Sequence, residues 1–137
     1  MKLNSEQLFA LSKSLRETSV AIGDYRFANW DALKPKQRSQ LEGAEWSLLN
    51  ASSDVTTIAV GLVLDESQWA FDKLKGLIEK SNKTLKTLNQ VREAINLATA
   101  AVGLAGAIIS KNPQAIAQQA KGLFDIINNK GKSQARG

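Results

Sequence analysis

Residues 41–62, LEGAEWSLLNASSDVTTIAVGL, carry the pattern that decides the fold. Apolar side chains recur there at unbroken three- and four-residue spacing, which places them on one face of an α-helix and fits no strand. The positions on this stripe are Leu41, Ala44, Leu48, Ala51, Val55, Ile58 and Leu62. Leu49, Ala59 and Val63 widen it, so we expect burial on more than a narrow seam. Pro35, whose fixed φ suits a first helical position, marks the start of this helix.

The two ends of the chain have the same helical period. At the N-terminal end, Asn4 and Gln7 form a capping-box pattern, and the helix that follows is predicted to end near Phe27. Its stripe consists of Leu8, Leu11, Leu15, Thr18, Ile22 and Tyr25. At the C-terminal end, the Asn-Pro pair at 112–113 predicts a helix start, and residues 128–131 (NNKG) predict its end.

Residues 66–110 form the longest periodic segment. Its stripe consists of Leu74, Ile78, Ser81, Leu85, Leu88, Val91, Ile95, Ala98, Val102, Ala105 and Ile109. The spacing includes one irregular 3-3 step at residues 85–91, which in a coiled coil is a stammer. A break at residues 81–82, or at Gly103 and Gly106, would shorten a rod of about 67 Å. Because the stripe keeps its phase across residue 81, a continuous or merely kinked helix is predicted, with Asp65 and Gln68 capping its start.

Together these segments predict an all-α fold, an elongated antiparallel bundle of about four helices with heptad-like seams. With 137 residues, the chain has the length of one domain, which we assign to residues 1–129. Residues 130–137 (KGKSQARG) contain no apolar side chain larger than Ala, and they are predicted to form a flexible basic tail. We expect Leu48, Ile58, Leu85, Leu88 and Ile95 to be buried in the core.

The composition argues against an enzyme. The chain has no Cys and no His, which excludes disulfide scaffolds, the common zinc and haem sites, and Cys or His catalysis. Glu42 and Glu45 form one acidic i,i+3 pair, but a helical magnesium site of the nucleotide-pyrophosphatase type needs a second pair, which is missing. No phosphate-binding glycine motif occurs. The prediction is therefore no catalytic residue, no metal, no cofactor and no small-molecule substrate.

Positive charge is concentrated in the second half of the chain. Residues 1–68 carry a net charge of −2 and residues 69–137 a net charge of +7. The candidate basic surface consists of Lys73, Lys80, Lys83, Lys86 and Arg92. No helix-turn-helix pattern or run of stacking aromatics accompanies these residues, so a nucleic-acid partner is not expected. A solvated helix face is the first interpretation, and docking on an anionic membrane is an alternative.

Residues 94–110 (AINLATAAVGLAGAIIS) are the longest uncharged run. At about 25 Å, a helix of this length is marginal for crossing a bilayer core of roughly 30 Å. The run therefore predicts either a helix at the centre of an assembly or a segment that is hidden first and meets a membrane later. The candidate residues of this assembly or membrane segment are Leu97, Val102, Gly103, Leu104, Gly106, Ile108 and Ile109.

The three tryptophans lie partly off the apolar stripes. Because Trp is enriched at protein interfaces, Trp30, Trp46 and Trp69 are candidate interface aromatics. The alternative is that each one caps an end of the bundle.

These features predict a non-catalytic helical protein that self-associates or docks a protein partner, with a homo-oligomer expected. The alternative is a membrane-active protein of the pore-forming or lysis type that inserts residues 94–110. The first residues lack the apolar core of a signal peptide, which predicts a cytoplasmic protein and leaves signal-independent export or membrane association open.

Overall fold

The computed structural model describes the backbone of residues 2–65 and 69–136, and side chains as far as residue 128. The helices are α1 (Ser5–Ala28), a 3₁₀ turn η1 (Trp30–Ala32), α2 (Pro35–Ile58), α3 (Phe71–Leu85), α4 (Val91–Ser110) and α5 (Pro113–Arg136). The described residues form no strand, only one isolated β-bridge between Lys2 and Val63. The all-α prediction is confirmed.

Three helices start at the residues that the sequence predicted. In α1, the Asn4 side chain accepts from the Gln7 backbone N–H at 2.8 Å, and the Gln7 side chain accepts from the Asn4 N–H at 2.9 Å. Pro35 is the first residue of α2. At α5, the Asn112 side chain accepts from two backbone N–H groups, at 3.0 and 3.2 Å. These caps satisfy donors that would otherwise lack an intrahelical partner.

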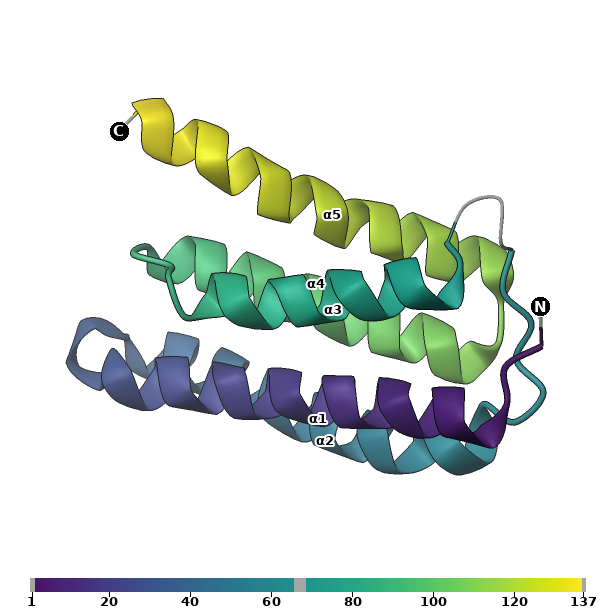
Figure 1. Ribbon diagram of the computed structural model, residues 1–137. Coiled ribbons are helices and arrows are strands. Elements are labelled where there is room, and N and C mark those ends of the chain that lie inside the picture. The colour runs from purple at the N-terminus through teal and green to yellow at the C-terminus, as the bar shows by residue number, and fades with distance from the viewer. Residues whose placement is uncertain (1, 66–68, 137) are drawn as a thin grey trace.

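Helix α4 lies at the centre of the arrangement and contacts each of the other four helices. Figure 1 shows α1 and α2 as a pair on one side of the molecule and α5 on the opposite side, with the connections alternating between the two ends. The side of α4 that faces its neighbours contains Ala94, Leu97, Ala98, Ala101, Leu104, Ala105, Ala107 and Ile108. Small alanines allow neighbouring helices to approach the central one closely.

The prediction of one helix over residues 66–110, and with it the count of about four, is wrong. The chain leaves the helix after Leu85, turns through residues 86–90, and starts α4 at Val91. The irregular step at residues 85–91 is therefore a turn between two helices. The apolar phase continues across it because Leu88, in the turn itself, is buried like the helical residues on either side. The break falls at neither of the two sites that the sequence suggested.

Two helix ends also differ from the prediction. Helix α3 begins at Phe71 rather than directly after Asp65, and the predicted cap residue Gln68 lies outside the described residues. The backbone of α5 stays helical to Arg136, beyond the predicted end at 128–131. The end residues there favour termination only weakly, because Gly in a helix costs about 1 kcal/mol and is tolerated.

The core confirms three of the five residues expected to be buried there, and it corrects Leu49 and Val63, which were expected to widen the buried stripe but are 38% and 51% exposed. Leu48, Leu85 and Leu88 are buried, and Ile95 is half-buried against the core. Ile58 is 46% exposed, so its expected burial is wrong. It is the last residue of α2, where the chain has begun to leave the helix.

Buried polar side chains hold α1 against two neighbours. The Ser12 hydroxyl donates to the Ser52 carbonyl oxygen of α2 at 2.5 Å. On another side of α1, the Thr18 hydroxyl donates to Asn82 Oδ1 of α3 at 2.5 Å, and Asn82 Nδ2 donates to the Ser14 carbonyl oxygen at 3.3 Å. Because buried polar groups need partners, these bonds fix the register of α1 against both helices.

Truncation of two residues of α2 tests this packing. We expect Leu48→Ala to lower the free energy of unfolding by about 2–5 kcal/mol, because it removes a fully buried side chain and leaves a cavity. Ile58→Ala, at an exposed position on the same helix, should stay within about 0.5 kcal/mol of the wild type. Urea denaturation followed by circular dichroism measures both, and equal losses would show that the phase of α2 is wrong.

Candidate functional site

Helices α1 and α2 expose apolar side chains on the side of the molecule that faces away from the core. Hydrogen bonds from Ser12 to Ser52 and from Ser19 to the Glu45 carbonyl oxygen mark the line along which the two helices touch. Helical periodicity places a second set of residues beside this line, on the solvent side of both helices. We call this set the α1/α2 outer face: Phe9, Lys13, Arg16, Val20, Asp24 and Phe27 of α1, Trp46 and Leu49 of α2, and Val60 in the turn after α2.

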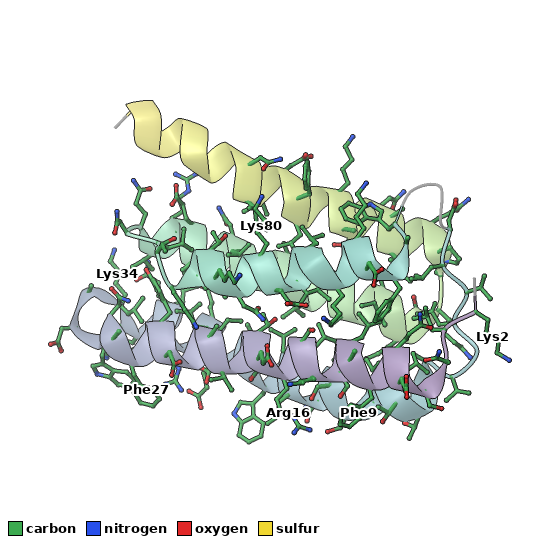
Figure 2. All side chains as sticks on the ribbon, in the orientation of Figure 1. Lys2, Phe9, Arg16, Phe27, Lys34 and Lys80 are labelled. Atoms are coloured by element: carbon green, nitrogen blue, oxygen red, sulfur yellow. The ribbon has the colours of Figure 1, made fainter. Side chains whose placement is uncertain are left out.

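The outer face is rich in large apolar groups. Six of the ten exposed large hydrophobic side chains among the described residues belong to it, including Phe27 at 67% exposure and Trp46 at 59%. In Figure 2, Phe9, Arg16 and Phe27 lie along the same edge of α1 and point away from α3, α4 and α5. Several large apolar side chains exposed on one side of a small protein are typical of an interaction site.

One end of the outer face carries an ordered aromatic projection. The Phe27 and Trp30 rings stack, with centroids 6.2 Å apart and planes 13° from parallel. The Arg26 guanidinium carbon lies 4.6 Å from the Phe27 centroid, and that of Arg38 lies 4.3 Å from the Trp30 centroid. Arg26 Nε also pairs with the Glu45 carboxylate at 2.5 Å. Cation–π contacts hold the two rings in place before any partner arrives. We call Phe27 and Trp30 the aromatic knob.

The other end of the outer face is concave. A hollow of about 470 Å³ lies between the start of α1 and the end of α2. It is lined by Lys2, Leu3, Asn4, Ser5, Leu8, Phe9, Thr56, Val60 and Gly61. The Leu3 N–H donates to the Leu62 carbonyl oxygen at 2.9 Å, which holds the chain before α1 beside the chain after α2. Its volume is large enough for an aromatic side chain.

The structure separates the predicted interface tryptophans. Trp30 and Trp46 lie on the α1/α2 hairpin, whereas Trp69 is half-buried and meets Phe124 of α5 edge-to-face at 6.3 Å. Sequence reasoning missed Phe9, Val20, Phe27 and Val60 as exposed apolar residues and expected Leu49 to be buried. The signal for the three residues of α1 was a second stripe, in which residues 9, 13, 16, 20, 24 and 27 recur at three- and four-residue spacing beside the core stripe.

The predicted basic residues surround α3 rather than the outer face. Lys73, Lys80, Lys83, Lys86 and Arg92 are all exposed. Lys73 Nζ lies 4.8 Å from the Trp69 ring centroid. On the neighbouring side of the helix, Lys75 forms an i,i+4 pair with Glu79 at 2.8 Å. Figure 2 places Lys80 on the side of α3 that faces α5.

The predicted assembly or membrane segment lies in α4. Leu97, Leu104 and Ile108 are buried, while Val102, Gly103 and Ile109 are half-buried. A Cβ added at Gly103 would come within 2.5 Å of Gln119 Oε1 of α5, whereas one added at Gly106 would meet nothing within 4 Å. Within the described residues, α4 is the one helix that is long and apolar enough to cross a membrane, and 44% of its apolar window is buried.

The acidic pair of α2 is divided between two environments. Glu45 is paired with Arg26, whereas Glu42 is exposed to solvent. Among the residues that the structure describes, no three carboxylates come close enough to hold one metal ion.

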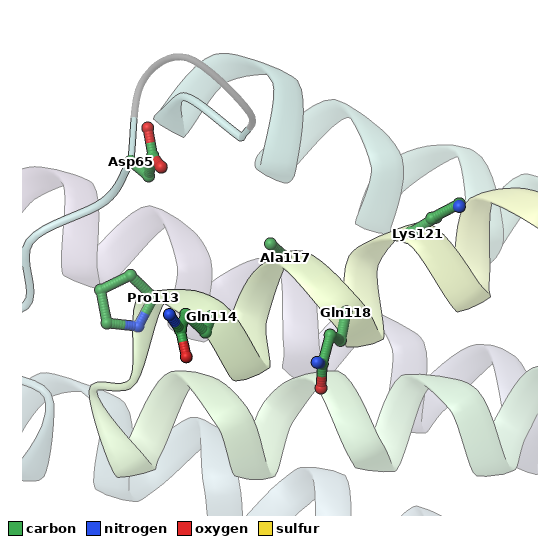
Figure 3. A pocket seen from close by; sticks show the side chains of 6 residues that line it. All are labelled: Asp65, Pro113, Gln114, Ala117, Gln118 and Lys121. Carbon is green, nitrogen blue, oxygen red and sulfur yellow. The ribbon is translucent and has the colours of Figure 1, made fainter.

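A polar groove lies between the segment that precedes α3 and the start of α5. Figure 3 shows the residues that line this space of about 460 Å³, which are Asp65, Pro113, Gln114, Ala117, Gln118 and Lys121. The lining contains one carboxylate, one ammonium group and two amides. Such a set brings together no acid–base pair of carboxylates and no activated nucleophile.

Helices α1 and α4 each carry one buried polar atom without a hydrogen-bond partner among the described residues. The Tyr25 hydroxyl and Glu93 Oε2 are buried, and neither has a hydrogen-bond partner within the described residues. Burial raises the pKa of the Tyr25 hydroxyl above its ordinary value of 10.0, and the Glu93 carboxylate raises it further. A proton is therefore held more firmly on this tyrosine than on an exposed one.

No protein-family model, curated protein or solved structure matches this chain. The geometry of its own surface is thus the basis for assigning a function.

The Tyr25 environment can be tested by titration, because Tyr25 is the only tyrosine. We expect the tyrosinate absorbance of the folded protein to appear above pH 10, and Glu93→Gln to lower that pKa toward 10 by removing the neighbouring charge. Glu42→Gln, at an exposed carboxylate, is the control and should leave the titration unchanged.

The same shift predicts how stability responds to alkali. Tyr25 ionises less readily in the folded chain than in the unfolded chain. Its contribution to stability is therefore complete below pH 10 and is lost as the pH rises through its raised folded-state pKa. A wild-type titration at the ordinary value, or no change in Glu93→Gln, would contradict the assigned environment.

Proposed function

We propose that this chain is a non-catalytic interaction or assembly protein, built as an antiparallel bundle with heptad-like seams, that self-associates or docks a protein partner. The observation that carries the proposal is the α1/α2 outer face, where aromatic and aliphatic side chains are exposed on a rigid pair of helices. Nothing else in the described chain covers this face.

The chemistry of the outer face supports protein binding. Trp and Arg are enriched among the residues that contribute most to protein–protein affinity, and both occur on the hairpin. The Phe27 and Trp30 rings are already held by arginines, so binding needs little ordering of these side chains. Polar and charged groups, such as Arg16 and Asp24, lie among the apolar ones, as at exposed interfaces that must also remain soluble.

The second candidate function, insertion of residues 94–110 into a membrane, is favoured by the length and apolar composition of α4. It requires the central helix to leave its four neighbours. Protein binding through the outer face requires no such rearrangement, because its residues are already exposed.

Sedimentation velocity over a range of micromolar concentrations, with and without anionic vesicles, tests the proposed function. Association in plain buffer supports it. A monomer that binds an apolar dye also supports it, because the exposed face is then free for a different protein. A monomer that binds no dye would overturn the proposal, and leakage of anionic vesicles would favour the membrane alternative.

Two lysine substitutions in α4 separate the candidate functions further. We expect Ala101→Lys to destabilise the fold by about 3–5 kcal/mol, because it buries an unpaired charge. Gly106→Lys should fold normally, because it extends into open space and replaces a helical glycine. Circular dichroism and thermal denaturation measure both effects.

The same Gly106→Lys variant also tests insertion of α4 into a membrane. A charge deep in a bilayer costs at least about 2.5 kcal/mol, so insertion of α4 predicts that this variant loses vesicle leakage while it remains folded. The proposed function predicts that its association matches that of the wild type. Loss of association in the folded Gly106→Lys variant would show that α4, rather than the outer face, makes the contact.

A further inference from the structure

We infer that the α1/α2 outer face pairs with the same face of a second copy of this chain, about a two-fold axis perpendicular to the helices at the level of Trp46. The inference rests on the proposed function and assigns its partner. In this arrangement, α1 runs antiparallel to α1 of the second copy. Three features of the face select this occupant and this orientation: the order of charges along α1, the positions of the knob and the hollow, and the size of the face.

The outer face carries charges of both signs on α1. Lys13 and Arg16 lie before its middle and Asp24 lies after it, while the exposed Glu6 lies beyond them near the start of the helix. When two copies of α1 pack antiparallel with their middles together, Lys13 of one copy lies opposite Asp24 of the other, and the contact occurs twice. Opposite charges then face each other across the interface, which favours this partner and this register.

Stacking α1 of one copy on α2 of the other is the alternative two-fold arrangement. The hydrogen bonds between Ser19 and Glu45 and between Ser12 and Ser52 fix which residues of the two helices lie side by side. In that arrangement Asp24 would lie level with Gln40, between Arg38 and Glu42, and the contact between Lys13 and Asp24 would not form. The two Lys13–Asp24 contacts therefore favour the arrangement in which α1 meets α1.

The shape of the outer face favours the same antiparallel arrangement as its charges. The aromatic knob, Phe27 and Trp30, stands at one end of the outer face, and the hollow beside Phe9 lies at the other end. At 1.5 Å per residue, each lies roughly 15 Å from the middle of α1. The antiparallel arrangement therefore places the knob of each copy over the hollow of the other. One surface supplies both halves of the fit, as an isologous dimer requires.

The face has the area that a stable dimer needs. Helix α1 has 24 residues, a length of about 36 Å, and two packed helices present a width of roughly 20 Å. The footprint is then about 700 Å² per copy, or about 1,400 Å² in total, which is within the range of specific interfaces. Trp46 lies at the centre of this footprint, where residues that dominate affinity are usually found.

The distribution of charge across the molecule also favours pairing through this face. Residues 1–68, which include the α1/α2 hairpin, carry a net charge of −2, and residues 69–137 carry +7. Pairing hairpin to hairpin leaves the two basic halves at opposite ends of the dimer. Their repulsion is thereby kept small, whereas contact through α3 or α5 would bring like charges together.

Light scattering coupled to gel filtration tests the inference on the full chain. We expect the wild type to have twice the monomer mass of 14.9 kDa. Trp46→Glu should weaken the dimer more than about tenfold by placing a charge at the centre of the face. Ile58→Glu introduces the same charge at an exposed apolar residue of α2 outside the face, and it should remain dimeric.

A charge exchange tests the orientation. Lys13→Asp alone and Asp24→Lys alone each place like charges opposite one another twice, so both variants should dimerise less than the wild type. The two variants mixed together, or the double variant Lys13→Asp/Asp24→Lys, restore opposite charges and should recover dimer. Both residues are exposed, so the monomer should keep the circular dichroism spectrum of the wild type.

The outcomes separate this inference from the proposed function. A wild-type dimer that Trp46→Glu leaves intact overturns the inference and retains an assembly function through another surface. Loss of dimer in Trp46→Glu without recovery in the mixed charge variants overturns the antiparallel orientation. A monomer that binds an apolar dye overturns pairing with a second copy while the proposed function stands, and a monomer without dye binding overturns both.

Discussion

The need to bury α4 determines the rest of the structure. Between Glu93 and Lys111 the chain carries no charge, so a helix over these residues cannot face water on all sides. Each of the other helices contributes a side to its enclosure. The alanines of α4 let these neighbours lie close, and its leucines and Ile108 fill the spaces between them. With α4 at the centre, α1 and α2 form an outer layer, and their solvent side carries six of the ten large apolar side chains that the described residues leave exposed.

The helix boundaries that the sequence predicted well are those marked by a capping residue or a proline. Asn4, Pro35 and the Asn-Pro pair at 112–113 mark starts because each satisfies or removes an orphan backbone donor there. The turn between α3 and α4 has no such marker. Leu88 is apolar and buried, and it keeps the three- and four-residue spacing of a helix although it lies in a turn. The sequence therefore shows the same apolar pattern for a turn at this place as for a continuous helix. Only the packing of two short helices, instead of one long rod, distinguishes them.

The candidate site also has some residues that the sequence identifies and others that it does not. Two of the three tryptophans selected from the sequence, Trp30 and Trp46, are exposed on the α1/α2 hairpin. They lie off the core stripe, so the core does not cover them. The remaining apolar members were missed, since periodicity shows that α1 has two stripes but not which one the core covers. The polar side chains that decide this are Ser12, Thr18 and Ser19. Their partners lie 26 to 64 residues away, so no local pattern reveals them.

The two candidate functions differ in how many buried contacts the fold must lose. Insertion of α4 into a bilayer separates it from α2 and α5 and exposes its eight core residues, together with the surfaces that they cover. Loss of that burial costs on the order of 10 kcal/mol, comparable to the whole stability of a domain of this size. Lipid would have to offset this cost before insertion could begin. Association through the α1/α2 outer face leaves every buried contact in place and adds to the apolar area removed from water. This difference in cost supports the proposal of assembly over insertion.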